Sequence, residues 1–272
     1  LLQALEKSPE YQQLLDAISR GSVAAVSGLS QITRSHFLAA LHAKSSRPSV
    51  FLVQDELAAS RLQEELESFL GVQIPILPER ELTFVEASGV SRQWEQKRLK
   101  LLYDLAAGKL PLLIASFGAM ALRTMPRAVL FSASILLRVG ASFTPEDLIE
   151  RLTQAGYSRT TLVEGVGQFA LRGGILDVWS PLSAPVRVEF FDDEVDAMGE
   201  FDVTTQRRTQ NVKSLTVLPA AEVLPALSDG GREKMLERLG RAAQKIAKKA
   251  EDSPIVQTLR SDIERLRNDL PL

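Results

Sequence analysis

The chain has 272 residues, of which 45% are hydrophobic and 24% charged, values typical of a globular protein with a sizeable core. Its formal net charge of −2 argues against a strongly electrostatic nucleic-acid-binding protein. The absence of cysteine excludes disulfides and thiolate metal sites, and no apolar run approaches the ~20 residues of a membrane-spanning helix. We expect a cytoplasmic protein without a membrane partner and, because the sequence does not begin with methionine, a fragment of a longer chain.

Strands alternate with helices in residues 1–133, which we expect to form a first domain. Short apolar runs predict buried strands, and longer runs with a helical period predict the helices between them. The strands are expected at residues 22–26, 49–53, 74–78 and 112–116, and the main helices at residues 9–19, 55–70 and 91–105. This alternation favours an α/β fold, a parallel sheet with helices on both faces.

Residues 22–43 have the layout of a phosphate-binding loop, with a strand, a glycine turn and a helix. Gly28 and Ser35 fit the template G-x-x-x-x-G-K-[ST], but Thr33 replaces its second glycine and Arg34 replaces its lysine. The glycine allows backbone N–H groups to curl around phosphates, and arginine does not replace the compact lysine charge. We therefore interpret the segment as a degenerate, P-loop NTPase-like relic that binds no cofactor.

Residues 134–219 are expected to form a small α+β domain that is inserted into the first domain. A strand at residues 134–139 precedes a helix with Thr144 as its N-cap and Pro145 as its first residue. An antiparallel meander follows, with glycines at one turn and aspartates at another. A last strand at residues 214–219 is expected to return the chain to the first domain, where residues 220–272 form charged helices.

One face of the meander is a candidate binding surface. Side chains alternate across a strand, so Arg187 and Phe191 share the face opposite to the valines at positions 186 and 188. Arg172 is expected to point outward as well. Aromatic and arginine side chains dominate protein-binding hot spots, which favours a docking site. The alternative is that Phe191 packs on a neighbouring domain while the arginines are merely solvated.

Three motifs in order are specific enough to indicate a family: RGGILD at residues 172–177, RVEFFDDE at 187–194 and F-D-x-x-T-Q-R at 201–207. With them, residues 20–225 resemble the N-terminal module of the bacterial transcription-repair coupling factors (Mfd), which is related to the nucleotide-excision-repair helicase UvrB. The resemblance implies that residues 1–133 are like UvrB domain 1a, that residues 134–219 are like domain 2, and that residues 220–272 begin a truncated domain 1b.

The resemblance also implies a function, a protein-interaction module for DNA repair that recruits UvrA to stalled transcription complexes. Arg172 and Arg187 would pair with carboxylates of UvrA, and Phe191 would fill an apolar pocket. A C-terminal domain of the full-length protein would mask this surface. RNA polymerase and DNA would be bound only by domains outside this chain, whose parent would be an ATP-dependent translocase. We expect the chain itself to be a monomer and no enzyme.

Side chains for catalysis or metal binding are not arranged in known patterns. The two histidines, His36 and His42, do not share a helix face, and no G-x-S-x-G nucleophile motif occurs. Four acids lie near one expected turn and are more simply explained as an exposed hairpin than as a metal site: Asp192, Asp193, Glu194 and Asp196. No catalytic or metal-binding residue is therefore assigned.

Two alternative functions remain to be compared with this one. A nucleotide-binding, UvrB-like damage-verification enzyme requires an intact phosphate loop and an aromatic hairpin, for which residues 77–91 are too short and too poor in tyrosine. Direct DNA binding would use the basic residues of 232–249, but their apolar stripe favours a packing helix with solvated lysines.

Overall fold

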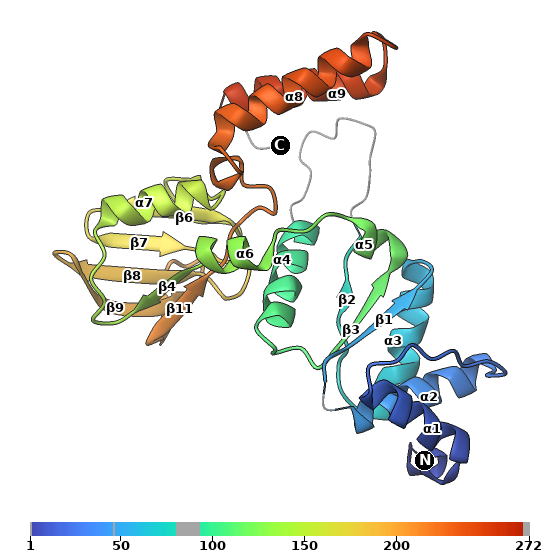
Figure 1. Ribbon diagram of the computed structural model, residues 1–272. Coiled ribbons are helices and arrows are strands. Elements are labelled where there is room, and N and C mark those ends of the chain that lie inside the picture. Colours follow the sequence, from blue (N-terminus) through green and yellow to red (C-terminus); the bar gives the residue numbers. More distant parts are fainter. Residues whose placement is uncertain (1, 46, 80–92, 269–272) are drawn as a thin grey trace. The chain divides into compact units, whose positions relative to one another are not determined.

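The computed structural model describes residues 2–45, 47–79 and 93–268, and the chain divides into two compact units, Leu1–Arg123 and Thr124–Leu272 (Figure 1). Each unit has its own sheets and its own core, and each is described by itself. Within the described ranges, no helix is both long and apolar enough to cross a membrane.

The first unit is built on a three-stranded parallel sheet with the strand order β1-β3-β2. Its strands are β1 (Ser49–Val53), β2 (Ile76–Leu77) and β3 (Leu112–Ser116). Its helices are η1 (Leu2–Lys7), α1 (Pro9–Ser19), α2 (Gln31–Lys44), α3 (Glu56–Leu70), α4 (Gln93–Ala106) and α5 (Phe117–Ala121).

Both faces of the central strand β3 are covered, as the predicted α/β fold requires. Leu112 and Ile114 pack with residues of α2 and α3, whereas Leu113 and Ala115 pack with residues of α4 and α5. A strand that is buried on both faces needs a continuous apolar run rather than an alternating one, which the sequence LLIA provides. The prediction of a parallel sheet between helices is confirmed.

The strand predicted at residues 22–26 does not form. These residues have no regular secondary structure, all are exposed, and Val23 is as accessible as in an open chain. A strand is stable only where its backbone N–H and C=O groups pair with a neighbouring strand. The next strand in the sequence, β1, pairs with β3 and not with residues 22–26. The apolar pattern of residues 22–26 is typical of a strand, but among the described residues no strand pairs with this segment.

The second unit contains a six-stranded sheet with the order β10-β9-β8-β7-β6-β5 and a two-stranded antiparallel sheet of β4 and β11. All neighbours in the larger sheet are antiparallel except β5 and β6. The strands are β4 (Ile135–Arg138), β5 (Ser158–Arg159), β6 (Gln168–Arg172), β7 (Ile175–Val178), β8 (Val186–Phe191), β9 (Glu194–Phe201), β10 (Arg208–Asn211) and β11 (Ser214–Val217).

The helices of this unit include the one that was predicted from its cap. They are α6 (Arg127–Ala133), α7 (Pro145–Gln154), η2 (Pro225–Leu227), α8 (Gly231–Ala247) and α9 (Pro254–Arg267). Helix α7 begins as expected, because the Asp147 N–H donates a hydrogen bond of 3.2 Å to the Thr144 Oγ1 and Pro145 occupies the first turn.

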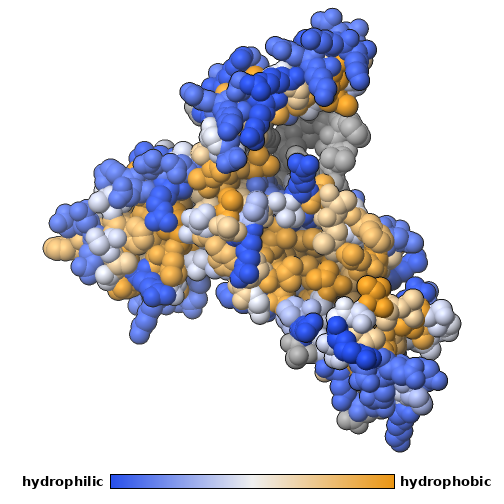
Figure 2. Space-filling view, in the orientation of Figure 1, coloured by the Kyte–Doolittle hydropathy of each residue, from blue (hydrophilic) through white to orange (hydrophobic). Residues whose placement is uncertain are grey.

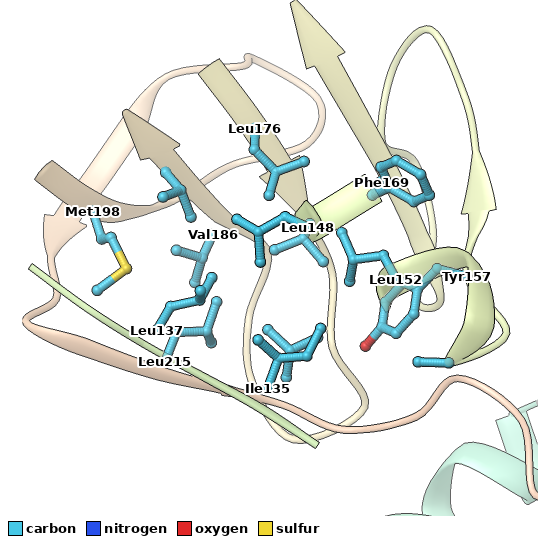
Figure 3. Close-up of a cluster of buried hydrophobic side chains, with 14 of the residues drawn as sticks. Ile135, Leu137, Leu148, Leu152, Tyr157, Phe169, Leu176, Val186, Met198 and Leu215 are labelled. Carbon is cyan, nitrogen blue, oxygen red and sulfur yellow. The ribbon is translucent and has the colours of Figure 1, made fainter. Parts of the chain in front are cut away.

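The core of the second unit lies between one face of the six-stranded sheet, helix α7 and the two-stranded sheet (Figure 3). Phe169 and Leu176 come from the sheet, and Leu148 comes from α7. Leu215 of β11 joins the same core, so this last strand packs within the range 134–219 that was predicted as one domain. Strand β11 pairs with β4 because both strands bury alternate apolar side chains here.

The last two helices form a hairpin. Ala243 of α8 is buried, as are Val256, Ile263 and Leu266 of α9, and the two helices contact each other. Their remaining faces are charged, and Figure 2 shows a mostly hydrophilic surface over them. The apolar stripe predicted within residues 232–249 therefore serves helix packing, as expected.

Candidate protein-docking surface

The outer face of the six-stranded sheet, opposite to the core of Figure 3, carries two rows of cross-strand neighbours. The strand register places each member of a row beside the next one on the adjacent strand. The inner row consists of Ala170, Asp177, Arg187 and Gly199. The outer row consists of Arg172, Ile175, Glu189 and Ala197. Directly opposed side chains lie close enough to interact, so the rows define the surface.

A buried aspartate brings the two predicted arginines together. Asp177 is fully buried, and its Oδ1 and Oδ2 accept hydrogen bonds from Arg187 Nε (2.7 Å) and Nη2 (2.9 Å). Arg172 Nη2 donates to the same Oδ2 at 2.6 Å. The two-point contact between a guanidinium and a carboxylate is the strong and geometrically specific form of ion pair. The hydrogen bonds to Asp177 raise the pKa of Arg187.

Arg187 is enclosed to a degree that side-chain alternation did not predict. Its Nη1 donates to the Gln206 carbonyl oxygen (3.1 Å) and its Nη2 to the Gln206 Oε1 (3.2 Å). The guanidinium carbon also lies 4.8 Å from the centre of the Phe201 ring, a cation–π contact. The Arg187 side chain is therefore only 17% exposed, whereas that of Arg172 is 47% exposed. Both lie on the expected face, but only Arg172 is open to solvent.

The F-D-x-x-T-Q-R motif forms the turn that covers Arg187. The Thr205 N–H donates to Asp202 Oδ1 at 2.7 Å, and this bond lowers the pKa of Asp202. Gln206 has a φ of +59°, in the left-handed region that non-glycine residues seldom adopt. Its N–H donates to the Asp202 carbonyl oxygen at 2.7 Å. The turn thus folds back over the sheet and directs Gln206 onto the guanidinium.

Phe191 points away from the domain, as the alternation predicted. It is 78% exposed and lies at the end of β8, next to the turn at Asp192. On the adjacent strand, Ile175 is 38% exposed. Beside it, Glu189 accepts a hydrogen bond from Arg208 Nη1 at 3.0 Å. The exposed acids near the turn form no group of three possible metal ligands among the residues that the structure describes.

Comparison with known proteins identifies the part of the chain that holds this surface. Residues 135–223 match the family described as the UvrB interaction domain. The chain is also 34% identical over 275 residues to the transcription-repair-coupling factor of Myxococcus xanthus, covering 96% of this chain and 22% of the relative. The corresponding protein of Bacillus subtilis (strain 168) is 28% identical over 268 residues, which cover 96% of this chain and 23% of the relative.

The chain is a homologue of the transcription-repair coupling factors. It spans about a fifth of the length of these relatives. The residues matched to the UvrB interaction domain begin at β4 and end shortly before η2, so they contain the whole six-stranded sheet. The cluster of Arg172, Asp177 and Arg187 and the exposed Phe191 therefore lie within this domain.

The degenerate phosphate loop of this coupling-factor homologue is not confirmed. Helix α2 begins at Gln31 with Ser30 as its N-cap, so Thr33 and Arg34 lie in its first turn rather than in a loop. Ser35 is buried, and its hydroxyl donates to the carboxylate of Glu65. A carboxylate at the hydroxyl that would bind a phosphate-bound metal ion disfavours a phosphate there. The aromatic hairpin of a UvrB-like enzyme would fall on residues 77–91, most of which lie outside the described residues.

The sequence predicted the exposed residues of this surface but not the residues that hold their side chains in place. Asp177 was overlooked although it is part of the RGGILD motif and alternates onto the same face as Ile175. Gln206 could have been suspected only as a turn residue, because nothing local shows that it reaches Arg187. Asp177 contacts residues on the two neighbouring strands, 5 and 10 positions away, whereas Gln206 contacts Arg187 across 19 positions.

Proposed function

We propose that the chain is a protein-interaction module that recruits UvrA during transcription-coupled nucleotide excision repair. The outer face of the six-stranded sheet is the docking surface, with Arg172, Arg187 and Phe191 as its central residues. The observation that carries this proposal is the bare Phe191 beside an ordered arginine cluster, inside a domain that matches the UvrB interaction family.

The shape and chemistry of the surface favour a protein partner. Small-molecule sites are usually concave and enclosed, whereas Phe191 protrudes at the end of a hairpin strand. A projecting aromatic ring next to arginine is typical of the few residues that dominate protein–protein binding. The ordered cluster also limits the side-chain entropy that docking would otherwise cost, because Arg187 is already fixed by four hydrogen bonds.

The proposal extends to the organisation of the longer protein. Residues 134–219 act as the docking domain, while residues 1–133 and 220–272 belong to a flanking domain without nucleotide hydrolysis. The chain acts as a monomer in the bacterial cytoplasm. Another domain of the full-length protein masks the docking surface at rest, and RNA polymerase and DNA are bound elsewhere.

Calorimetric titration of the purified chain with purified UvrA tests the function. We expect micromolar or tighter binding, and Phe191→Ala should weaken it by about 30-fold, corresponding to the ~2 kcal/mol of a typical hot spot. Phe117→Ala is the matched control, because Phe117 is also an exposed phenylalanine (62%) but lies in the first unit. Unchanged binding of the Phe191 variant, or equal losses in both variants, would refute the proposed surface.

A further inference from the structure

We infer that the partner presents one carboxylate to Arg172. Next to this carboxylate, the partner has an apolar recess that receives Ile175 together with Phe191. Arg187 is then a positioning residue whose charge is neutralised inside the domain by Asp177. This inference rests on the proposed function and specifies what the partner must present.

After ion pairing within the cluster of Arg172, Asp177 and Arg187, one positive charge remains for the partner to neutralise. Arg172 and Arg187 contribute two positive charges and Asp177 one negative charge, so the net charge is +1. Arg187 already uses its guanidinium for two bonds to Asp177 and two to Gln206. A partner carboxylate could reach it only by replacing these bonds. Arg172 makes a single bond to Asp177 and is the more exposed of the two, so it presents the remaining charge.

Ile175 lies between the exposed cation and the exposed phenylalanine. It is the cross-strand neighbour of Arg172 on one side and of Glu189 on the other. Phe191 is two residues beyond Glu189 on the same face of β8, so Ile175 and Phe191 are diagonal neighbours within reach of an aromatic side chain. The register thus places two exposed apolar side chains in line, beginning beside Arg172.

Glu189, the acid on β8 between the positions of Ile175 and Phe191, is already neutralised. Glu189 pairs with Arg208, and Arg208 is held across β9 by the absence of a side chain at Gly199. A Cβ at Gly199 would lie 2.1 Å from the Arg208 Nε. From Arg172 to Phe191 the surface therefore consists of a cation, apolar side chains and a neutral ion pair, with the exposed Glu194 across from Phe191 at the hairpin end. Its complement is a carboxylate at the edge of an apolar recess.

Ile175→Ala tests the apolar recess in the calorimetric titration with UvrA. Loss of a contact that is weaker than the Phe191 hot spot should reduce the affinity by roughly fivefold to tenfold. Leu136→Ala is the matched control, because Leu136 lies on β4 in the same unit and is comparably exposed, 46% against 38% for Ile175. If Ile175→Ala binds as wild type does while Phe191→Ala loses binding, a recess that also receives Ile175 is refuted and the proposed function stands.

The salt dependence of binding tests the division between the arginines. Exposed charges are screened by salt, so Arg172→Gln should weaken binding and flatten the dependence of affinity on NaCl concentration. The double variant Asp177→Asn with Arg187→Met removes one charge of each sign. It should weaken binding severalfold, because Arg172 loses its anchor, but retain the wild-type salt slope.

Each result has one reading. A flattened slope in the double variant, or an unchanged slope in Arg172→Gln, would overturn the assignment of the free charge to Arg172. Circular dichroism checks that the double variant is folded, and if it is not, the slope of Arg172→Gln decides alone. If wild-type chain does not bind UvrA, or if Phe191→Ala has no effect, the proposed function itself fails, and this inference fails with it.

Discussion

Removal of the buried carboxylate at Asp177 should be among the most destabilising single changes on the sheet. Asp177→Ala leaves the Arg187 side chain, which is only 17% exposed, without its ion-pair partner. Breaking a buried pair in this way typically costs about 3–5 kcal/mol. Because Arg187 keeps both bonds to Gln206 and some contact with water, we expect the lower end of that range, about 3 kcal/mol.

Urea unfolding followed by tryptophan fluorescence measures this loss. The chain has two tryptophans, and Trp179 packs against a buried cluster of the second unit. In a Trp94→Phe background, its emission reports the second unit alone. Asp196→Ala, an exposed acid on β9, is the control and should change stability by no more than about 0.5 kcal/mol.

The double variant of Asp177→Ala with Arg187→Met decides whether the charge is the cause. Replacing a buried ion pair by apolar side chains is often neutral, whereas removing one partner is not. We therefore expect the double variant to be more stable than Asp177→Ala by at least about 1 kcal/mol. A loss below about 1 kcal/mol in Asp177→Ala, or a double variant less stable than the single one, would contradict this account of the cluster.

Two further predictions concern other parts of the chain. Gly199→Ala should lower the melting temperature of the second unit and break the ion pair of Arg208, because the new Cβ would lie 2.8 Å from the Gln210 carbonyl oxygen; an unchanged melting curve would contradict this close contact. Burial lowers the pKa of His42, so the folded first unit favours the neutral ring and should lose stability as the pH falls from about 7.5 to about 5.5. Trp94 emission in a Trp179→Phe background should show this loss, and His42→Gln should reduce it; an equal pH effect in that variant would exclude His42 as the cause.

Local chemistry predicted the elements that depend on local contacts. The cap at Thr144, the alternation of β8 and the exposed ring of Phe191 all follow from residues within a few positions of each other. The central strand β3 was likewise recognisable from its apolar run, because a strand covered on both faces needs no polar side.

Long-range pairing explains what the sequence did not reveal. The apolar segment at residues 22–26 resembles a buried strand, yet its state depends on a partner that its own pattern cannot specify. Strand β11 was predicted as the last strand of residues 134–219, but its pairing with β4 was not, because the two strands are far apart in the sequence. The enclosure of Arg187 over Asp177 likewise depends on Gln206, which lies 19 residues beyond Arg187.

The enclosure of Arg187 changes how loss-of-binding variants at this site should be interpreted. If Arg187 is truncated, Asp177 is left with Arg172 as its ion-pair partner, and Arg172 should then be drawn toward the inner row. Binding would fall although Arg187 touched no partner atom. A loss in Arg187→Ala is therefore compatible with both direct contact and positioning. The salt slope of Arg187→Ala does not separate the two, because Asp177 would then neutralise Arg172 and the cluster would lose its net positive charge in either case. The charge-balanced double variant of Asp177→Asn with Arg187→Met separates them, because only a direct contact of Arg187 would flatten its salt slope.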